Sequence, residues 1–198
     1  HPALENKEFE IYFQPKVRTS NLAVSSAEVL VRWIRNGKML WSPDIYIPLF
    51  EQNGFVVDLD YYVYEQTFQW LRKYSGKLPQ GFRISLNVSP VHFEQPQTFI
   101  QKIQELIDSY CVEPSFLTFE ITESTYVNNP LAVNQVIRSL QNRNTQISMD
   151  DFGSGYSSLN TLKDLLFDEV KIDRMFLGDT ISESGHIVLE LSLIHISE

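Results

Sequence analysis

The sequence contains a single cysteine, no long hydrophobic run and no cluster of basic residues. One cysteine, Cys111, excludes an internal disulfide and a cysteine-rich zinc site, which weakly favours a reducing compartment. No apolar stretch approaches the roughly 18 residues of a membrane-spanning helix, and no signal peptide is visible. Lys and Arg number 16 against 25 Asp and Glu, and this net charge of −9 argues against a nucleic-acid polymer as partner. A small phosphate ligand held through a metal ion remains compatible with that charge.

Strand-like and helix-like patterns alternate along the chain, without repeats or a linker rich in Pro, Gly or Ser. Strand patterns cover 9–17, 22–33, 82–88, 116–122, 145–150 and 166–172. Helical patterns cover 42–54, 58–74, 97–110, 129–142 and 157–164, with Asp58 as the expected cap of the second. This alternation predicts parallel βαβ units, which close either as an open doubly wound sheet or as a barrel.

The first strand bears on that choice. An open dinucleotide-binding fold usually has a Gly-rich turn after its first strand, whereas this chain has 14-QPKV-17 at that place. The short link that follows contains Thr19, Ser20 and Asn21, which suits a hairpin. We therefore expect the first strand to run antiparallel to the second.

Each apolar strand carries a charged or amide side chain at or near its carboxyl end. These residues are Glu28, Asn87, Glu120, Asp150, Asp151, Lys171 and Asp173. In a (β/α) barrel the carboxyl ends of the strands converge on one face, where active sites are built. Oxygen ligands from several strands suit a hard cation such as Mg²⁺ or Mn²⁺. Two such ions, roughly 3.5–4 Å apart, could activate a water molecule and neutralise a phosphodiester.

Each of these residues, taken alone, also has a structural explanation. Asn87 could be a turn residue, Glu120 could form a surface salt bridge and Lys171 could face water. In 148-SMDDFGSGYSSL-159 the two aspartates precede a glycine-rich turn, so Asp151 could cap a helix. Adjacent carboxylates repel one another unless a cation neutralises them, and a metal ion would also account for the pair. Taken together these separate explanations are less convincing, because several strands carry a polar or charged side chain at the same end.

Several motifs occur together in an order that resembles one family. The stretch 27-AEVLVRW-33 resembles the motif that names the EAL domain family, with Val29 where the family usually has Ala. Further matching motifs are 14-QP-15, 86-LNVSP-90, 119-FEITES-124, 149-MDDFGSGYSSL-159 and 170-VKIDR-174. The match runs from about Phe9 to Phe176, and its most specific part is DDFGSGYSSL with VKID downstream. The chain is thus similar to EAL domains, which are cyclic di-GMP phosphodiesterases of bacterial signalling.

The resemblance implies an α/β fold, a modified (β/α)8 TIM-like barrel with an antiparallel first strand. It also implies hydrolysis of cyclic di-GMP to linear pGpG with two Mg²⁺ or Mn²⁺ ions. The implied metal ligands are Glu28, Asn87, Glu120, Asp150 and Asp151. Asp151 would also help hold the attacking water, Lys171 would orient or polarise it, and Glu123 would fix the loop 152–158, which links metal binding to dimerisation in the family. The implied substrate contacts are Gln14, Leu30 and Arg32, with Asp173 near the guanine or the water.

The C-terminal part departs from the family pattern. The family continues with a strand that carries a further glutamate ligand in an AEGVE-type motif, and then with a QG motif, and neither is present here. We therefore expect the last βα units to be missing and the activity of this chain to be impaired. The final LSLIHISE could continue a helix or could be a foreign tail. The expected organisation is the end of an upstream linker at 1–8, a partial EAL domain at 9–191 and a tail of uncertain origin at 192–198.

Three functions are compatible with this pattern. The first is an EAL phosphodiesterase, the second is a non-catalytic EAL-type receptor for cyclic di-GMP or a protein partner, and the third is an unrelated metal-dependent barrel hydrolase. The retention of Glu28, Asn87, Glu120, Asp150, Asp151 and Lys171 favours the enzyme, because a receptor has no need of the whole metal set. The implied partners are cyclic di-GMP, a second copy in a full-length homodimer, and an upstream sensory or GGDEF-type domain. The expected location is cytoplasmic, with any membrane anchor of the parent protein upstream of His1.

Overall fold

The fold is built on one sheet. The computed structural model describes residues 1–153 and 166–173, so the helix predicted at 157–164 lies outside the described residues. Within these residues the sheet has seven strands, in the order β1-β2-β4-β5-β6-β7, with β3 paired to β2 beside that path. The strands are β1 (Phe9–Val17), β2 (Val24–Arg35), β3 (Lys38–Trp41), β4 (Arg83–Asn87), β5 (Leu117–Thr122), β6 (Gln146–Phe152) and β7 (Glu169–Ile172).

Strand direction agrees with the sequence analysis. β1 pairs with β2 in the antiparallel sense, and the successive pairs from β2–β4 to β6–β7 are parallel. The predictions of an α/β fold with a mostly parallel sheet and of an antiparallel first strand are therefore confirmed. β3 was not predicted from the sequence; it pairs antiparallel with β2 across a turn at Asn36 and Gly37, both at positive φ. Within the described residues, β1 and β7 are the two ends of the pairing path.

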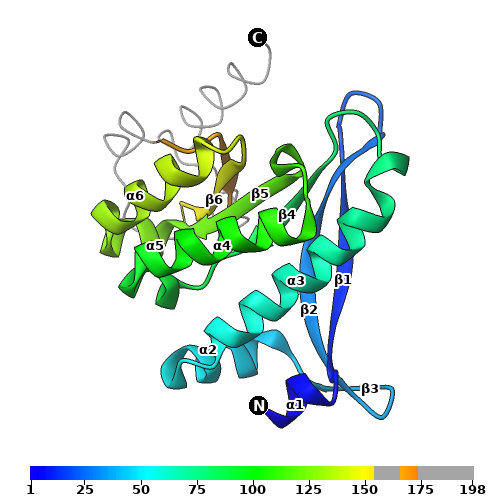
Figure 1. The fold of residues 1–198 in the computed structure, drawn as a ribbon, viewed down its shortest axis with the longest axis vertical. Coiled ribbons are helices and arrows are strands. Elements are labelled where there is room, and N and C mark those ends of the chain that lie inside the picture. The colour runs from blue at the N-terminus through cyan, green and yellow to red at the C-terminus, as the bar shows by residue number, and fades with distance from the viewer. Residues whose placement is uncertain (154–165, 174–198) are drawn as a thin grey trace, which may run out of the picture.

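Helices cover one side of the sheet, as the ribbon in Figure 1 shows. The α-helices are α1 (Pro2–Glu5), α2 (Pro43–Asn53), α3 (Val56–Tyr74), α4 (Pro96–Tyr110), α5 (Glu123–Asn128) and α6 (Pro130–Gln141). Short 3₁₀ helices are η1 (Ser75–Lys77), η2 (Pro90–Glu94) and η3 (Pro114–Phe116). Gly54 ends α2 at a φ of 78°, a left-handed value that glycine adopts without strain. The predicted cap Asp58 was wrong, because α3 begins at Val56 and Asp58 lies within its first turn.

The core lies between the helices and the sheet. On α4 the apolar side chains Phe99, Ile103 and Ile107 recur at helical spacing and are buried against the sheet. The first residues also belong to this core: Ala3 is buried, and the Glu8 carboxylate accepts a 2.8 Å hydrogen bond from Trp33 Nε1. The segment 1–8 thus packs against the domain that was expected to start at residue 9. The boundary between them stays a prediction.

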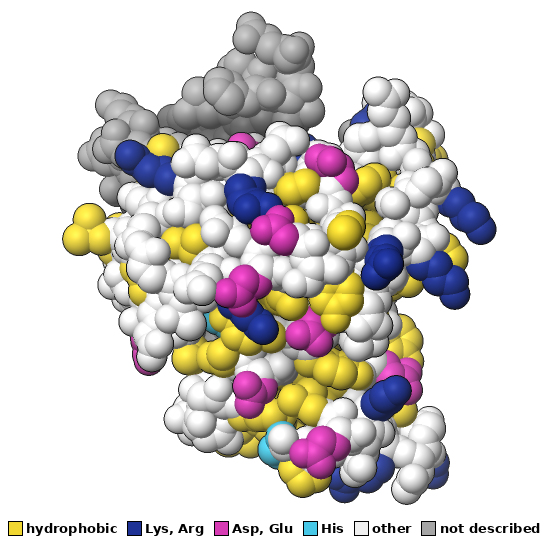
Figure 2. Space-filling view, in the orientation of Figure 1, with side chains coloured by type: hydrophobic (Ala, Val, Ile, Leu, Met, Phe, Trp, Pro, Cys, Tyr) yellow, Lys and Arg dark blue, Asp and Glu magenta, His cyan; other side chains and the backbone are white. Residues whose placement is uncertain are grey.

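The outer surface is mixed in charge. Figure 2 shows acidic and basic side chains interspersed with apolar ones on the helix-covered face. Among the described residues, no helix has both the length and the apolar character that crossing a membrane requires.

Candidate active site

The E-x-L-x-R spacing places three predicted site residues on one face of β2. Side chains alternate between the two faces of a strand, so Glu28, Leu30 and Arg32 share a face. The antiparallel register with β1 sets Gln14 opposite Glu28 and Tyr12 opposite Leu30. The β1–β2 ribbon therefore presents the predicted substrate-contacting residues together.

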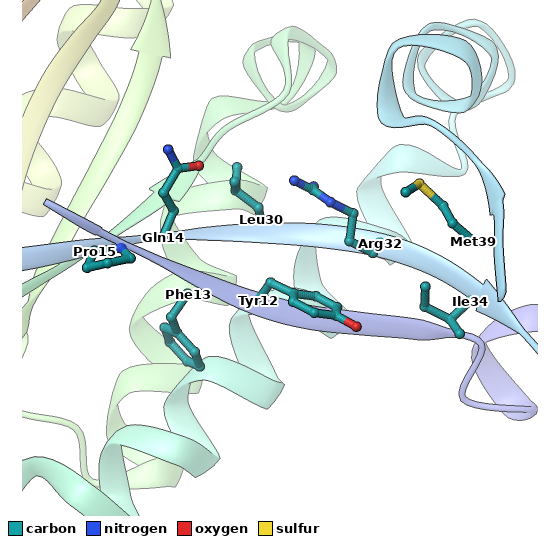
Figure 3. A pocket seen from close by; sticks show the side chains of 8 residues that line it. All are labelled: Tyr12, Phe13, Gln14, Pro15, Leu30, Arg32, Ile34 and Met39. Atoms are coloured by element: carbon teal, nitrogen blue, oxygen red, sulfur yellow. The ribbon is translucent and has the colours of Figure 1, made fainter. Parts of the chain in front are cut away.

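These residues line an open groove with a volume of about 450 Å³. In Figure 3 the side chains of Gln14, Leu30 and Arg32 project from the same side of the ribbon, and Phe13 points to the opposite side. The lining residues are Tyr12, Phe13, Gln14, Pro15, Leu30, Arg32, Ile34 and Met39. Apolar walls with one guanidinium and one amide suit a flat aromatic ligand that also carries acceptor groups.

Parallel pairing aligns the polar residues of the neighbouring strands. Asn87 at the end of β4 is level with Glu120 on β5, and Asp150 on β6 is level with Thr122. Glu28 differs from the prediction because it lies in the interior of β2 and not near its end. However, β2 pairs with β4 only over Ser26–Glu28, so Glu28 ends the parallel part of the strand. The rim of the parallel sheet therefore gathers side chains from four strands.

The ammonium group of Lys171 joins three of the predicted ligands. Its Nζ lies 3.3 Å from Glu28 Oε2 and 3.3 Å from Asp150 Oδ2, and it also contacts Glu120 Oε2. Asn87 Nδ2 donates a 3.2 Å hydrogen bond to the other oxygen of Glu28. Glu28, Asn87, Glu120, Asp150 and Lys171 therefore form one hydrogen-bonded cluster, as the sequence predicts.

A second lysine, which the sequence analysis missed, enters the same cluster. Lys16 Nζ lies 2.8 Å from Glu120 Oε1, 3.0 Å from Ser85 Oγ and 3.9 Å from Glu28 Oε2. A signal was present in the sequence, because Lys16 lies two residues after Gln14 and therefore on the same face of β1. Glu120, with a fully buried side chain, is thus held between two ammonium groups.

These contacts change the acidity of the central groups. Burial alone would raise the pKa of Glu120, but the nearby ammonium groups of Lys171 and Lys16 outweigh it and hold the pKa below its usual value. Burial alone would lower the pKa of Lys171, but Glu120, Glu28 and Asp150 raise it well above its usual value. In this arrangement Lys171 is a cationic hydrogen-bond donor to three carboxylates.

A β-bulge sets the geometry of the two adjacent aspartates. Between β6 and β7 the register passes from Met149↔Val170 to Phe152↔Ile172, so β6 contains one extra residue. Asp151 takes a left-handed φ of 56°, and its amide donates a 3.0 Å hydrogen bond to Asp150 Oδ1. Burial, then repulsion from Asp150 and Asp173, raise the pKa of the Asp151 carboxyl. Bulges of this kind are common beside active sites, where they redirect a side chain.

Two other predicted residues lie beside the cluster. Glu123 opens α5 and is buried, and its Oε2 accepts a 2.7 Å hydrogen bond from the amide of Gly153. This contact ties α5 to the start of the loop 152–158, most of which lies outside the described residues. Asp173 follows β7, and its amide donates to the carbonyl of Phe152.

A buried polar network supports the segment after Asn87. Asp60 Oδ2 on α3 accepts from the Ser89 amide at 3.2 Å and contacts His92 Nε2 at 2.9 Å. The Ser89 hydroxyl donates to Glu51 on α2 at 2.9 Å, and Tyr64 on α3 donates to the Asn87 carbonyl at 2.8 Å. Both helices therefore anchor Asn87 and the residues that follow it.

The donor set fits a hard divalent cation in kind, because three carboxylate oxygens already converge on one positive group. Their present arrangement is built around the Lys171 ammonium. Among residues 1–153 and 166–173, no group of three or more His, Cys, Asp or Glu side chains is arranged to hold a metal ion. Binding of a cation would therefore require that the contacts of Lys171 be replaced.

Comparison with known proteins gives a consistent result. Residues 1–193 match the family model described as EAL domain. The cyclic di-GMP phosphodiesterase PdeF of Escherichia coli is 31% identical over 195 residues, which is 98% of this chain and 26% of PdeF. The cyclic di-GMP phosphodiesterase RocR of Pseudomonas aeruginosa is 32% identical over 174 residues, which is 88% of this chain and 44% of RocR. The chain thus spans less than half the length of these relatives.

Solved structures agree with the sequence comparisons. The cyclic di-GMP complex of the PaMucR phosphodiesterase superposes with a TM-score of 0.84 at 30% identity, and the match covers 97% of this chain and 78% of that one. The FimX EAL domain, at 20% identity and the same TM-score of 0.84, supports the fold alone. The motifs, the strand order with its antiparallel first strand, and these matches show that the chain belongs to the EAL domain family.

Proposed function

We propose that this domain hydrolyses cyclic di-GMP to linear pGpG in a metal-dependent reaction. One observation carries the proposal: Glu28, Asn87, Glu120, Asp150 and Lys171 form a single cluster on a strand face that continues into the groove of Gln14, Leu30 and Arg32. Relatives named as cyclic di-GMP phosphodiesterases, at 31% and 32% identity, supply the substrate class.

The residues of the chain would have the following roles in this reaction. Glu28, Asn87, Glu120, Asp150 and Asp151 would hold two Mg²⁺ or Mn²⁺ ions, whose contribution when bound is Lewis-acid stabilisation of charge on the phosphodiester. Arg32 and Gln14 would orient the nucleotide through its acceptor groups, and Leu30 would pack against a base. Lys171 would donate hydrogen bonds to the attacking water and to the negative charge that develops. Glu123 would position the loop that begins at Gly153.

The context of the domain belongs to the same proposal. We place the activity in the cytoplasm of a longer protein with an upstream sensory or GGDEF-type domain, and we expect the full-length protein to be a homodimer. MucR of Pseudomonas aeruginosa, 30% identical over 192 residues, is named as a bifunctional diguanylate cyclase and phosphodiesterase, which supports this organisation.

The test is hydrolysis of cyclic di-GMP with Mg²⁺ or Mn²⁺ by the domain completed with the family's remaining βα units, followed by chromatography of the nucleotide products. Glu28→Ala should lower the rate by orders of magnitude, because it removes a carboxylate that joins Asn87 to Lys171. Glu105→Ala, an exposed position on α4, is the matched control and should retain the parent rate. Unchanged turnover by Glu28→Ala would remove Glu28 from the site. Tight binding of cyclic di-GMP without product would favour the receptor function.

A further inference from the structure

The two lysines of the cluster use different oxygens of Glu120. Lys171 contacts Oε2, together with Glu28 Oε2 and Asp150 Oδ2, so it occupies the point where the ligand oxygens converge. Lys16 contacts Oε1, at 2.8 Å, and completes its hydrogen bonding with the buried Ser85 hydroxyl at 3.0 Å. A metal ion that binds the convergent oxygens would therefore replace Lys171 and leave the contact of Lys16 intact.

The register of the sheet explains this difference. Lys16 pairs with Ser26, which pairs with Arg83 at the start of β4, whereas Glu120 is level with Asn87 at its end. Lys16 thus reaches Glu120 from the amino-terminal side of the parallel strands. Lys171 lies between Val170 and Ile172, whose partners on β6 flank the two aspartates, and it approaches from the rim.

The charges of the cluster indicate how Lys16 would affect the carboxylates and a bound cation. Glu28, Glu120, Asp150 and Asp151 carry four negative charges, and once Lys171 is displaced Lys16 is the ammonium that stays in direct contact with a ligand carboxylate. A cation beside a ligand carboxylate stabilises that carboxylate in the absence of metal and repels a divalent ion from it.

We propose that Lys16 is a resident counter-cation and positioning residue of the metal site. It keeps Glu120 paired and oriented through Oε1 whether or not metal is bound, and it lowers the affinity of the site for divalent cations, so that the metal is held reversibly. The inference rests on the proposed metal-dependent function and extends it to a residue on the antiparallel strand.

The experiment measures two quantities that should move in opposite directions. The 198-residue chain and its Lys16→Met, Lys16→Gln and Lys16→Arg variants are melted in chelator, and their Mn²⁺ affinity is measured from the electron paramagnetic resonance signal of free Mn²⁺. Lys16→Met should lower the metal-free Tm by about 5 °C, because Glu120 Oε1 loses its hydrogen-bond donor while Oε2 keeps Lys171. The same variant should bind Mn²⁺ about ten-fold more tightly, because the repelling charge is gone.

The other variants separate charge from packing. Lys16→Gln keeps a donor for Glu120 but no charge, so Mn²⁺ should bind more tightly even if Lys16→Met fails to fold. Lys16→Arg keeps the charge and should restore the parent affinity. Lys38→Met, at an exposed position on β3, is the matched control and should change neither quantity.

The outcomes distinguish this inference from the proposed function. If the parent chain binds Mn²⁺ but Lys16→Gln binds it with equal or lower affinity, Lys16 is not a counter-cation and only this inference is overturned. If the parent chain binds no Mn²⁺, this inference fails, whereas the proposed function is decided separately by the hydrolysis assay.

Discussion

The left-handed backbone of Asp151 in the bulge can be tested by comparing the stabilities of its glycine and alanine variants. Asp151 has a φ of 56°, a region in which a side chain with a Cβ costs about 1–2 kcal/mol and glycine costs little. Asp151→Gly and Asp151→Ala both remove the carboxylate, so the difference between them isolates the backbone. Glycine reduces this advantage by about 0.5–1 kcal/mol, because its unfolded chain has more conformational freedom to lose on folding. The net expectation is that Asp151→Gly is more stable than Asp151→Ala by about 1 kcal/mol.

The measurement is thermal unfolding of both variants in chelator. For a chain of this size about 1 kcal/mol corresponds to roughly 2–4 °C in Tm. If Asp151 instead lay inside a right-handed helix, the order would reverse, because alanine is favoured over glycine in a helix interior by about 1 kcal/mol. An equal or higher Tm for Asp151→Ala would therefore refute the bulge. Both variants should lose hydrolysis by orders of magnitude, since each lacks the proposed ligand.

Two further predictions concern the same side of the molecule. The amide of Ser89 and the ring of His92 share one oxygen of Asp60. Asp60→Ala should therefore lower the free energy of unfolding by about 1–3 kcal/mol, and Asp60→Asn should lower it less, because its amide oxygen can accept in the same place. Equal losses in urea titrations would contradict the shared acceptor. The pKa of Asp151 is raised, so its carboxyl keeps a proton to higher pH than an ordinary aspartate, and Mn²⁺ affinity should fall as the pH drops through that raised pKa. Asp151→Asn should abolish that part of the pH dependence, and an unchanged profile would exclude Asp151 as a ligand.

The sequence by itself determined the elements and one face of the site. Apolar periodicity located the principal strands, and α2, α3, α4 and α6 begin and end close to the predicted positions. It missed α1, β3 and α5, of four, four and six residues, because such short elements give too few turns or alternations for a pattern. Glu28, Leu30 and Arg32 could be placed together from sequence alone, because a strand has a side-chain period of two whatever lies next to it.

Only the tertiary structure decided which side chains meet. Lys171 and Glu28 are 143 residues apart, and Lys16 and Glu120 are 104 apart, so their contacts depend on which strands pair and in which register. The bulge at Asp151 is likewise a property of two strands, since the extra residue on β6 is defined only against its partner β7. The alternation along β1 places Lys16 on the face of Gln14, but it does not indicate which carboxylate the lysine contacts. The charge balance of the site was therefore set by the packing of β1 and β7 against the strands between them.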